Sequence, residues 1–485
     1  MAREEEIRKE REKKLKELIA KGIDPYAHSF NVKDKTAELQ KKYEKLKPGE
    51  KKEEKARVAG RIISIREHGK IAFATLQDST GKIQLFLEKN IPNFDFFKRY
   101  IDTGDIIGCE GKIFRTARGE LSIAVEDFKL LTKSLAVLPE KWHGLQDKEL
   151  RYRQRYLDLI VNPHVKEIFL KRSTIIEAMR KFLLKRGYVE VETPILQPIY
   201  GGTNARPFET FLHALKMKLY LRISNELYLK RLLVGGYEKL FEFSPDFRNE
   251  GIDRLHNPEF LQLETMHAYV DYRYNMKLFQ ELIAYVAKQV LGKTKISYQG
   301  KELDLGRWKK LSMLEAIENY TGLNFDCSES NARKLAIKAG VSIEDCSSWG
   351  EIVEKVFSEL VEPKLQEPHI IYDMPASNGL AKLKHEDNRL AERFEPFVAG
   401  FELGNSYSEE NDPKRIEAFW RKAEQEFKKG KIEAQRLDID FIKALEYGMP
   451  PASGLGIGID RLVMLFTDSA SIRDVILFPF MKPEK

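Results

Sequence analysis

Residues 247–260, FRNEGIDRLHNPEF, bring together side chains whose types suit the binding of a charged substrate. The stretch carries two arginines, a glutamate, a histidine and an asparagine: Arg248, Arg254, Glu250, His256 and Asn257. An arginine can grip a phosphate or a carboxylate through two parallel hydrogen bonds and keeps its charge while doing so. The other polar side chains can orient the bound group. A solvated surface hairpin with scattered charge is the competing interpretation.

A second stretch near the C-terminus, PPASGLGIGIDRLVMLF, combines glycines with another arginine. Gly454, Gly456 and Gly458 alternate, which leaves one face of a strand nearly bare and lets a flat ring approach the backbone. Arg461 falls in the first turn of the helix predicted to follow. The spacing is not that of a GxGxxG dinucleotide loop, because the third glycine comes one position early, and the chain has no GxxxxGK[ST] loop. Two arginines in separate stretches indicate a triphosphate held in a bent form.

A third stretch, LAERFEPFVAGFELGNSYSEEND, holds paired carboxylates around an apolar strand. Glu395 and Glu402 could share Mg²⁺ with phosphate oxygens, since this ion takes one or two protein carboxylates beside the phosphates of its substrate. Two ordinary surface glutamates are the alternative interpretation. Three further polar residues follow at every second position and share one face if the chain is extended: Asn405, Tyr407 and Glu409.

The first stretch must be positioned by two strands. Apolar residues 240–243 precede it and residues 261–269 follow it, a pattern typical of a β-hairpin with a long loop. Side chains alternate between the two faces of a strand, so Phe260, Glu264 and Met266 share one side. Phe260 then offers a stacking surface, and Glu264 offers an anchor for an ammonium group.

Residues 58–133 have the alternation of a small β-barrel, with IAFATLQ, the turn DSTGK and IQLFLE forming a hairpin. If the small and aliphatic residues of these strands pack inward, Phe73 and Gln84 point outward. An outward aromatic ring beside an amide suits single-stranded nucleic acid, whose bases stack on the ring and offer their edges to the amide. An ordinary surface phenylalanine is the alternative.

FRNE…HNPEF followed far downstream by GLGIGIDR resembles motifs 2 and 3 of the class II aminoacyl-tRNA synthetases, and the particular wording is similar to that of the lysyl-tRNA synthetases. The resemblance covers about residues 22–483. It implies an α+β fold, in which an N-terminal OB-fold β-barrel precedes a class II catalytic domain with an antiparallel sheet flanked by helices. The expected divisions are a charged helical extension (1–56), the anticodon-binding OB-fold (57–140), a linker (141–165) and the catalytic domain (166–485), with a helical insertion at about 292–377.

The resemblance also implies a reaction and the residues that serve it. L-lysine would react with ATP to form lysyl-adenylate, and lysine would then pass to the 3′ end of its tRNA. The expected catalytic residues are Arg248, Glu250 and Arg461. ATP would be bound by Arg248, Glu250, His256, Asn257, Phe260, Glu395, Glu402 and Arg461, with Mg²⁺ on Glu395 and Glu402. Lysine would be bound by Gly202, Glu226, Glu264, Asn405, Tyr407 and Glu409, and the anticodon by Arg66, Phe73 and Gln84.

Three of the expected lysine-binding residues are carboxylates, which makes the amino-acid pocket an acidic hole with no unassigned arginine. An aspartate side chain is repelled there, whereas an ammonium group is paired. Met266 departs from the family, which usually has a tyrosine at this place, and NGLAK at residues 378–382 replaces the usual SPLAK. The alternatives left open are the sister specificities for asparagine or aspartate, a protein-modifying lysyl transferase, and a non-catalytic RNA-binding paralogue.

Composition and the N-terminal sequence set the expected cellular context. The chain has 485 residues, a formal net charge of +7, and three cysteines without a CxxC pair, which argues against a zinc site or a disulfide framework. It has no apolar leader and no apolar run of about eighteen residues, so a cytoplasmic protein without membrane spans is expected. Residues 169–196 resemble motif 1, the dimer interface of this class, so a homodimer is expected. Residues 1–22 alternate in charge and predict a solvated helix.

Overall fold

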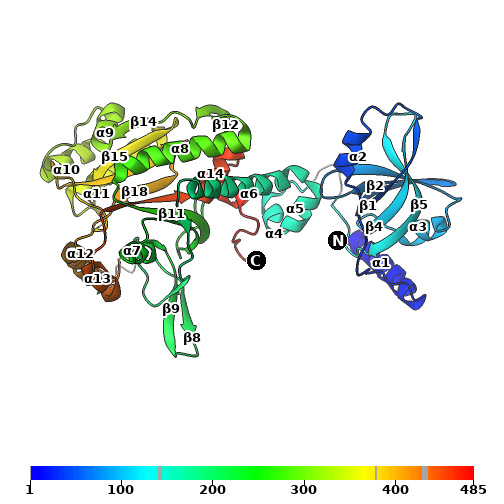
Figure 1. Cartoon of the computed structure of the whole chain (residues 1–485), viewed down its shortest axis with the longest axis horizontal. Helices are drawn as coiled ribbons and strands as arrows, with labels where there is room; N and C mark the ends of the chain where they lie inside the picture. Colours follow the sequence, from blue (N-terminus) through cyan, green and yellow to red (C-terminus); the bar gives the residue numbers. More distant parts are fainter. Residues whose placement is uncertain (1, 140–144, 377–378, 429–434, 485) are drawn as a thin grey trace. The chain divides into compact units, whose positions relative to one another are not determined.

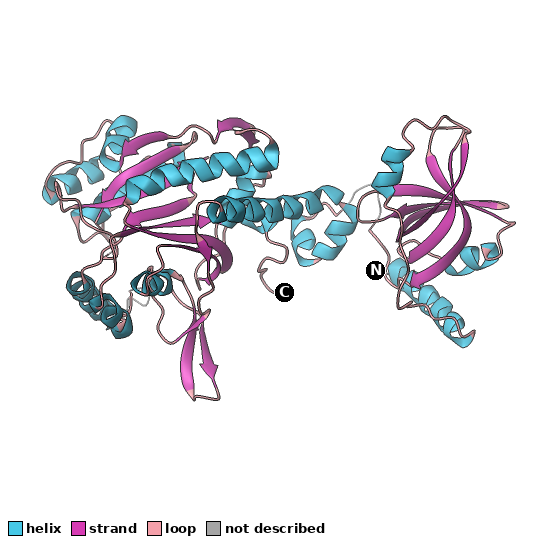
Figure 2. Cartoon of the chain, in the orientation of Figure 1, coloured by secondary structure: helices cyan, strands magenta, loops and turns pink. Residues whose placement is uncertain are grey.

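The computed structural model describes residues 2–139, 145–376, 379–428 and 435–484. The chain divides into two compact units, Met1–Gly144 and Leu145–Lys485, and each unit has a hydrophobic core of its own. Both units mix helices and strands (Figures 1 and 2), which confirms the predicted α+β class. Asn378 and the first residues of the expected linker, 141–144, lie outside the described residues. No described helix is long and apolar enough to cross a membrane.

The N-terminal unit is a closed barrel in the strand order β1-β2-β3-β5-β4. Its elements are α1 (Ala2–Ala20), α2 (Thr36–Lys42), β1 (Lys51–His68), β2 (Ile71–Gln77), β3 (Lys82–Glu88), α3 (Phe94–Tyr100), β4 (Ile106–Arg115) and β5 (Leu121–Thr132). Strict alternation sends Ala72, Ala74 and Leu76 inward, where all three are buried, as are the aliphatic residues of β3. The predicted hairpin and its inward face are therefore confirmed.

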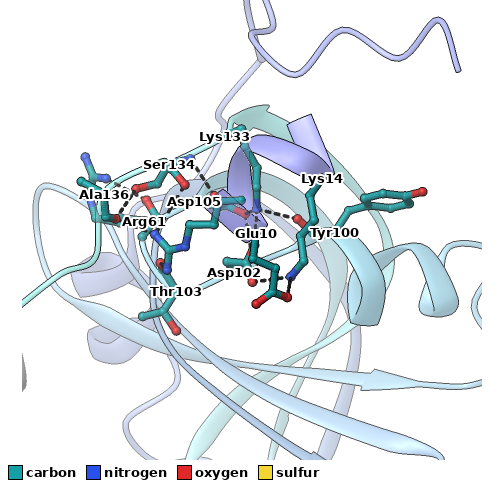
Figure 3. A network of polar contacts seen from close by, with 12 residues as sticks. Glu10, Lys14, Arg61, Tyr100, Asp102, Thr103, Asp105, Lys133, Ser134 and Ala136 are labelled. Carbon is teal, nitrogen blue, oxygen red and sulfur yellow. Dashed lines mark hydrogen bonds and ion pairs between the residues drawn. The ribbon is translucent and has the colours of Figure 1, made fainter. Parts of the chain in front are cut away.

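Charged side chains join α1 to this barrel (Figure 3). Lys133 is buried and pairs with Asp102 and Asp105 at 2.5 and 2.8 Å, and Lys14 of α1 reaches the same Asp102 at 2.8 Å. Leu18 of α1 is fully buried in the barrel core. The prediction of a solvated helix is wrong for this face of α1, because a thin apolar stripe and a shared aspartate are enough to hold it on the barrel.

The larger unit is built on one large sheet in the strand order β14-β15-β16-β18-β19-β11-β10-β6, with β17 paired to β16. The strands are β6 (Val189–Glu190), β10 (Lys239–Phe247), β11 (Glu259–Ala268), β14 (Lys309–Ser312), β15 (His369–Pro375), β16 (Leu390–Val398), β17 (Phe401–Glu402), β18 (Gly404–Ser408) and β19 (Ala452–Gly458). Most neighbours are antiparallel, and the predicted long-looped hairpin is the pair β10–β11. The pairs β14–β15 and β10–β6 are parallel.

Helices α6 (Pro163–Leu184), α8 (Tyr272–Leu291) and α14 (Ile459–Phe466) pack on one face of this sheet (Figure 1). Leu263 of β11 and Leu455 of β19 point into this helix-covered core. Because strand side chains alternate, their neighbours Glu264, Gly454 and Gly456 point to the opposite face. That face carries the candidate site.

The segment at 292–377, predicted as a mostly helical insertion, contains strands as well as helices. It contains β12 (Lys295–Tyr298), β13 (Lys301–Asp304), α9 (Met313–Thr321), α10 (Glu329–Lys338), α11 (Trp349–Leu360) and a 3₁₀ turn at Glu362–Lys364, together with β14 and β15. The last two strands extend the main sheet. The prediction missed β15 because it is buried on both faces, so its sequence lacks the alternation that marks a half-exposed strand.

The remaining elements lie at the borders of the sheet. They are α4 (Lys148–Arg153), α5 (Arg155–Val161), β7 (Leu196–Gln197), β8 (Glu209–Leu212), β9 (Met217–Leu221), α7 (Glu226–Val234), α12 (Pro413–Lys428), α13 (Ile439–Glu446) and α15 (Ile472–Val475). Of these, α7 matters most for the site, because it begins at Glu226, one of the expected lysine-binding residues.

Candidate active site

A cavity of about 630 Å³ opens on the face of the sheet that faces away from α8. Strands β11, β16, β18 and β19 form its floor, and the β10–β11 loop and the start of α14 form part of its wall. Every residue predicted to bind ATP or lysine lines this one cavity. Gly202, one of these lining residues, has a backbone φ of 92°, in the left-handed region.

The β10–β11 loop and the first turn of α14 meet at the end of the cavity where the nucleotide is expected to bind. Arg461 lies 3.1 Å from Nε2 of His256 and donates to the backbone oxygen of Glu402 at 2.8 Å. The guanidinium of Arg248 stacks 4.9 Å from the ring centre of Phe260. Two arginines from segments far apart in sequence therefore open onto one cavity, as a bent polyphosphate requires. The arrangement can bind a purine by stacking and phosphates by charge.

Carboxylates crowd together beside Arg461. Glu395 is joined by Glu402, Glu354 and Glu362, and it accepts a hydrogen bond from Arg393. Burial raises the pKa of Glu395 to about 8; Arg393 opposes this rise, while Glu402 and Glu354 add to it. The pKa of Glu362 is raised by burial and by Glu402. Such crowding of oxygen donors fits a divalent cation.

The residues present fit an Mg²⁺ site whose remaining ligands come from the bound substrate. Among the described residues, no group of three or more histidine, cysteine, aspartate or glutamate side chains forms a metal cage by itself. Mg²⁺ commonly takes one or two carboxylates and fills its other positions with phosphate oxygens and water. Glu395 and Glu402 suit this role. Glu354 and Glu362 could not be predicted as site residues, since no motif in the sequence distinguishes them from the other glutamates around them.

The expected amino-acid end is acidic and buried. Glu264 and Glu409 project from β11 and from the end of β18, and Glu226 begins α7. Burial raises the pKa of Glu264 well above its usual range, and Glu226, Asp246 and Glu409 add to the effect. Burial also raises the pKa of Glu409 to about 8, where Lys230 acts against the rise and Glu226 acts with it. The pocket is therefore short of positive charge and can accept ammonium groups.

Glycines of β19 make room for these carboxylates. In the sheet register, Gly456 lies between Asn405 and Glu264, and Gly454 lies between Tyr407 and Met266. A Cβ atom on Gly454 would lie 2.4 Å from Oε1 of Glu409, and one on Gly456 would lie 2.6 Å from Oε1 of Glu264. The bare strand face predicted for a flat ring thus also serves the amino-acid end.

Lys230 is a residue that the sequence analysis missed: it does not itself line the cavity, but it contacts two carboxylates that do. Its ammonium group is fully buried and lies 2.6 Å from Glu226 and 2.5 Å from Glu409. The pair with Glu409 has an ion-pair distance but lacks hydrogen-bond alignment, because neither carboxylate oxygen of Glu409 has an aligned donor among the described residues. The carboxylates of the acidic pocket are therefore accompanied by one buried ammonium group, that of Lys230. Its spacing of four residues from Glu226 on a helix was the available signal.

The candidate anticodon residues share the outer surface of the barrel. Arg66 pairs in register with Phe73 and lies 3.4 Å from the amide oxygen of Gln84. The rings of Phe73 and Phe86 are 5.2 Å apart, and Phe114 continues the row at 5.6 Å from Phe86. The structure thus adds Phe86 and Phe114 to Phe73, and the three half-buried rings form one aromatic row on the barrel.

Comparison with known proteins identifies the families of the two units. Residues 147–482 match the family model described as tRNA synthetases class II (D, K and N), and residues 56–131 match that of the OB-fold nucleic acid binding domain. The chain belongs to the class II tRNA synthetases. The predicted resemblance is confirmed, and so is the predicted pairing of an OB-fold with a class II catalytic domain.

Several curated relatives of this synthetase carry the name lysine–tRNA ligase. The relative from Pelotomaculum thermopropionicum is 52% identical over 99% of this chain and 96% of its own length. That from Moorella thermoacetica is 51% identical over 97% of both chains. That from Methanoculleus marisnigri is 48% identical over 97% of this chain and 94% of its own length.

Proposed function

We propose that this class II synthetase is a lysine–tRNA ligase. The observation that carries the proposal is a single cavity that holds two arginines for a nucleotide and three buried carboxylates for an amine. Relatives of that name match nearly the whole chain at about half identity. An enzyme for aspartate would have to bury a fourth carboxylate beside the three, which is strongly unfavourable.

The first step joins lysine to ATP. An oxygen of the lysine carboxylate attacks the α-phosphorus, the bond from that phosphorus to the bridging oxygen breaks, and pyrophosphate leaves. Arg248 binds both the carboxylate and the α-phosphate, and it stabilises the charge that develops between them. Phe260 stacks on the adenine, and Arg461 binds the far phosphates. Glu250, His256 and Asn257 orient the nucleotide.

The second step transfers lysine to tRNA. The terminal ribose hydroxyl attacks the carbonyl carbon of the adenylate, and AMP leaves. The protein supplies positioning and charge rather than a nucleophile. Mg²⁺, held by Glu395 and Glu402 when bound, supplies further positive charge to the phosphates. Gly202, Asn405 and Tyr407 complete the amino-acid pocket beside Glu226, Glu264 and Glu409.

The barrel supplies the RNA-binding half of the proposal. Arg66, Phe73 and Gln84 would read a splayed anticodon base by stacking and by hydrogen bonds to its edge. A nucleic acid-binding barrel favours tRNA over a protein as the acceptor. The complete set of charged residues in the cavity favours catalysis over a non-catalytic RNA-binding role, since RNA binding needs none of them.

We also propose that the protein is a cytoplasmic homodimer. Apolar side chains remain exposed along α6 and the segment after it: Leu170, Leu184, Val189, Ile195, Leu196 and Ile199. Exposed apolar side chains supply the kind of surface that a second copy of the chain can cover. Cys109, Cys327 and Cys346 are all free thiols, which suits the reducing cytoplasm.

The decisive experiment is ATP–pyrophosphate exchange with lysine, asparagine or aspartate as the only amino acid, followed by charging of a tRNA with a UUU-type anticodon. Lysine alone is expected to support exchange and charging. Exchange with asparagine or aspartate in place of lysine contradicts the proposed specificity. Retained tRNA binding without exchange for any of the three supports the non-catalytic alternative.

A further inference from the structure

Lys230 lies directly behind the amino-acid pocket, and its two ion-pair partners are carboxylates that line the cavity. Its ammonium group sits between Glu226 and Glu409, at 2.6 and 2.5 Å, and 5.4 Å from the ring centre of Tyr407. The side chain is completely buried. A buried lysine is costly unless its charge is used, so its position needs an explanation.

The charges of the pocket supply that explanation. Glu226, Glu264 and Glu409 contribute three negative charges, and Lys230 contributes one positive charge. A bound lysine molecule brings two more ammonium groups, while its carboxylate pairs with Arg248. Three carboxylates then face three ammonium groups, and the buried site is neutral.

We propose that Lys230 is a positioning residue that acts as the third ammonium group of the pocket. It holds Glu226 and Glu409 in place. Because it neutralises only one of the three carboxylates, the pocket still needs two positive charges, which an amino acid with two ammonium groups supplies. The inference rests on the proposed lysine specificity and extends it to a residue that is not itself expected to touch substrate. An amino acid with a neutral side chain leaves one buried negative charge uncompensated.

The surrounding groups agree with this assignment. The charged and titratable groups that face Lys230 or its partners are Glu226 on α7, Asp246 and Arg248 at the end of β10, Glu264 on β11, and Tyr407 and Glu409 on and after β18. Burial acts against the ammonium form, but Glu226 and Glu409 outweigh it, so the pKa of Lys230 is raised and the residue is charged. Lys230 compensates one of the three carboxylates of the free pocket, so protons remain on the others near neutral pH, in agreement with the raised pKa values of Glu264 and Glu409.

The test replaces Lys230 with methionine, which keeps the length of the side chain and removes its charge. The matched control is Lys181→Met. Lys181 forms the same type of pair, 2.6 Å from Glu177 one helical turn away, but both members of that pair are exposed. In pyrophosphate exchange, Lys230→Met is expected to raise the KM for lysine by about tenfold or more, the equivalent of one pKa unit of lost interaction. The KM for ATP and the behaviour of Lys181→Met should stay close to wild type.

A second measurement needs no substrate. Without Lys230, the buried carboxylates have raised pKa values and nothing to neutralise them, so the folded variant loses stability as pH rises through those values. The difference in Tm between wild type and Lys230→Met is expected to widen from pH 6 to pH 9. Adding Glu226→Gln to Lys230→Met removes one carboxylate. The difference in Tm from wild type should then widen less with pH, and the KM for lysine should recover in part. A difference that is independent of pH, or losses that simply add in the double variant, would overturn the inference.

Two further variants keep the test decisive. If Lys230→Met does not fold, Lys230→Met/Glu226→Gln replaces it and is expected to fold and to have a KM for lysine no higher than that of Glu226→Gln; a clearly higher KM overturns the inference. Lys230→Arg keeps the positive charge, so its difference in Tm from wild type should not widen as pH rises. Absence of lysine-dependent exchange in the wild-type protein would overturn the proposed function, whereas normal wild-type exchange with an unchanged KM in Lys230→Met overturns only the role of Lys230.

Discussion

Arg248 is the residue on which the proposed chemistry depends most. Its guanidinium stacks on Phe260 and makes one weak hydrogen bond, to the backbone oxygen of Ile223 at 3.3 Å. Removing it should therefore leave the fold intact. Arg248→Ala is expected to lower lysine-dependent pyrophosphate exchange by about 100- to 1,000-fold, the usual cost of losing one charge-stabilising donor.

The Arg248→Ala measurement is pyrophosphate exchange at saturating ATP and lysine, with the Tm recorded alongside. An unchanged Tm shows that the loss is chemical. Exchange at the wild-type rate would show that Arg248 does not stabilise the transition state.

The raised pKa of Glu409 predicts how lysine binding varies with pH. The free pocket holds protons near neutral pH, because the pKa of Glu409 is about 8 and that of Glu264 is well above its usual range. Two incoming ammonium groups displace those protons, so binding strengthens as pH rises. The KM for lysine is expected to fall between pH 6.5 and pH 8. Exchange kinetics at saturating ATP measure this directly, and a KM that rises or stays flat over that range contradicts the assignment.

At the scale of elements, the glycines of β19 set the shape of the amino-acid end. A Cβ atom on Gly454 would meet Oε1 of Glu409 at 2.4 Å and Cε of Met266 at 2.9 Å. Overpacking of this kind costs about 1–3 kcal/mol. Gly454→Ala is therefore expected to raise the KM for lysine about tenfold or more while changing the KM for ATP much less.

Gly458→Ala on the same strand provides the comparison. Its Cβ atom would have no neighbour closer than 3.7 Å, so its effect on lysine binding should be clearly smaller. Equal effects of the two substitutions would show that the strand is sensitive to any added methyl group and that the contact with Glu409 is not the cause.

Elements with strong local signals could be predicted from the sequence. The barrel strands β2 and β3 have one buried face and one more exposed face, and two-residue alternation records that difference directly. The β10–β11 hairpin was predictable for another reason, because two apolar runs flank a loop rich in turn-forming residues. Strand β15 lacks the alternation because both of its faces are buried. Lys230 escaped notice for another reason: its spacing from Glu226 marks an ordinary surface ion pair as readily as a buried one, and only the packing of α7 against β18 separates the two.

At the scale of the whole molecule, the two units are expected to contribute separately. Phe73 lies on the barrel with Phe86, and the cavity is lined only by residues of the larger unit. Phe73→Ala should raise the KM for tRNA in charging by roughly 5- to 150-fold, since stacking of one base is worth about 1–3 kcal/mol. Pyrophosphate exchange, which needs no tRNA, serves as the internal control. A comparable loss in exchange would contradict the division of labour.

Strand β19 comes from near the end of the chain, yet it lies in the interior of the sheet, between β18 and β11. During synthesis on the ribosome, β11 and β18 emerge first and wait with unpaired edges for residues 452–458. Exposed edges of this kind attract other strands and slow folding by long-range pairing. Until this strand has paired, the nascent chain lacks the part of the cavity floor that lies between the pocket carboxylates, and it cannot bind substrates. Chains truncated before β19 are expected to require chaperones and to aggregate rather than to persist as partly active enzyme.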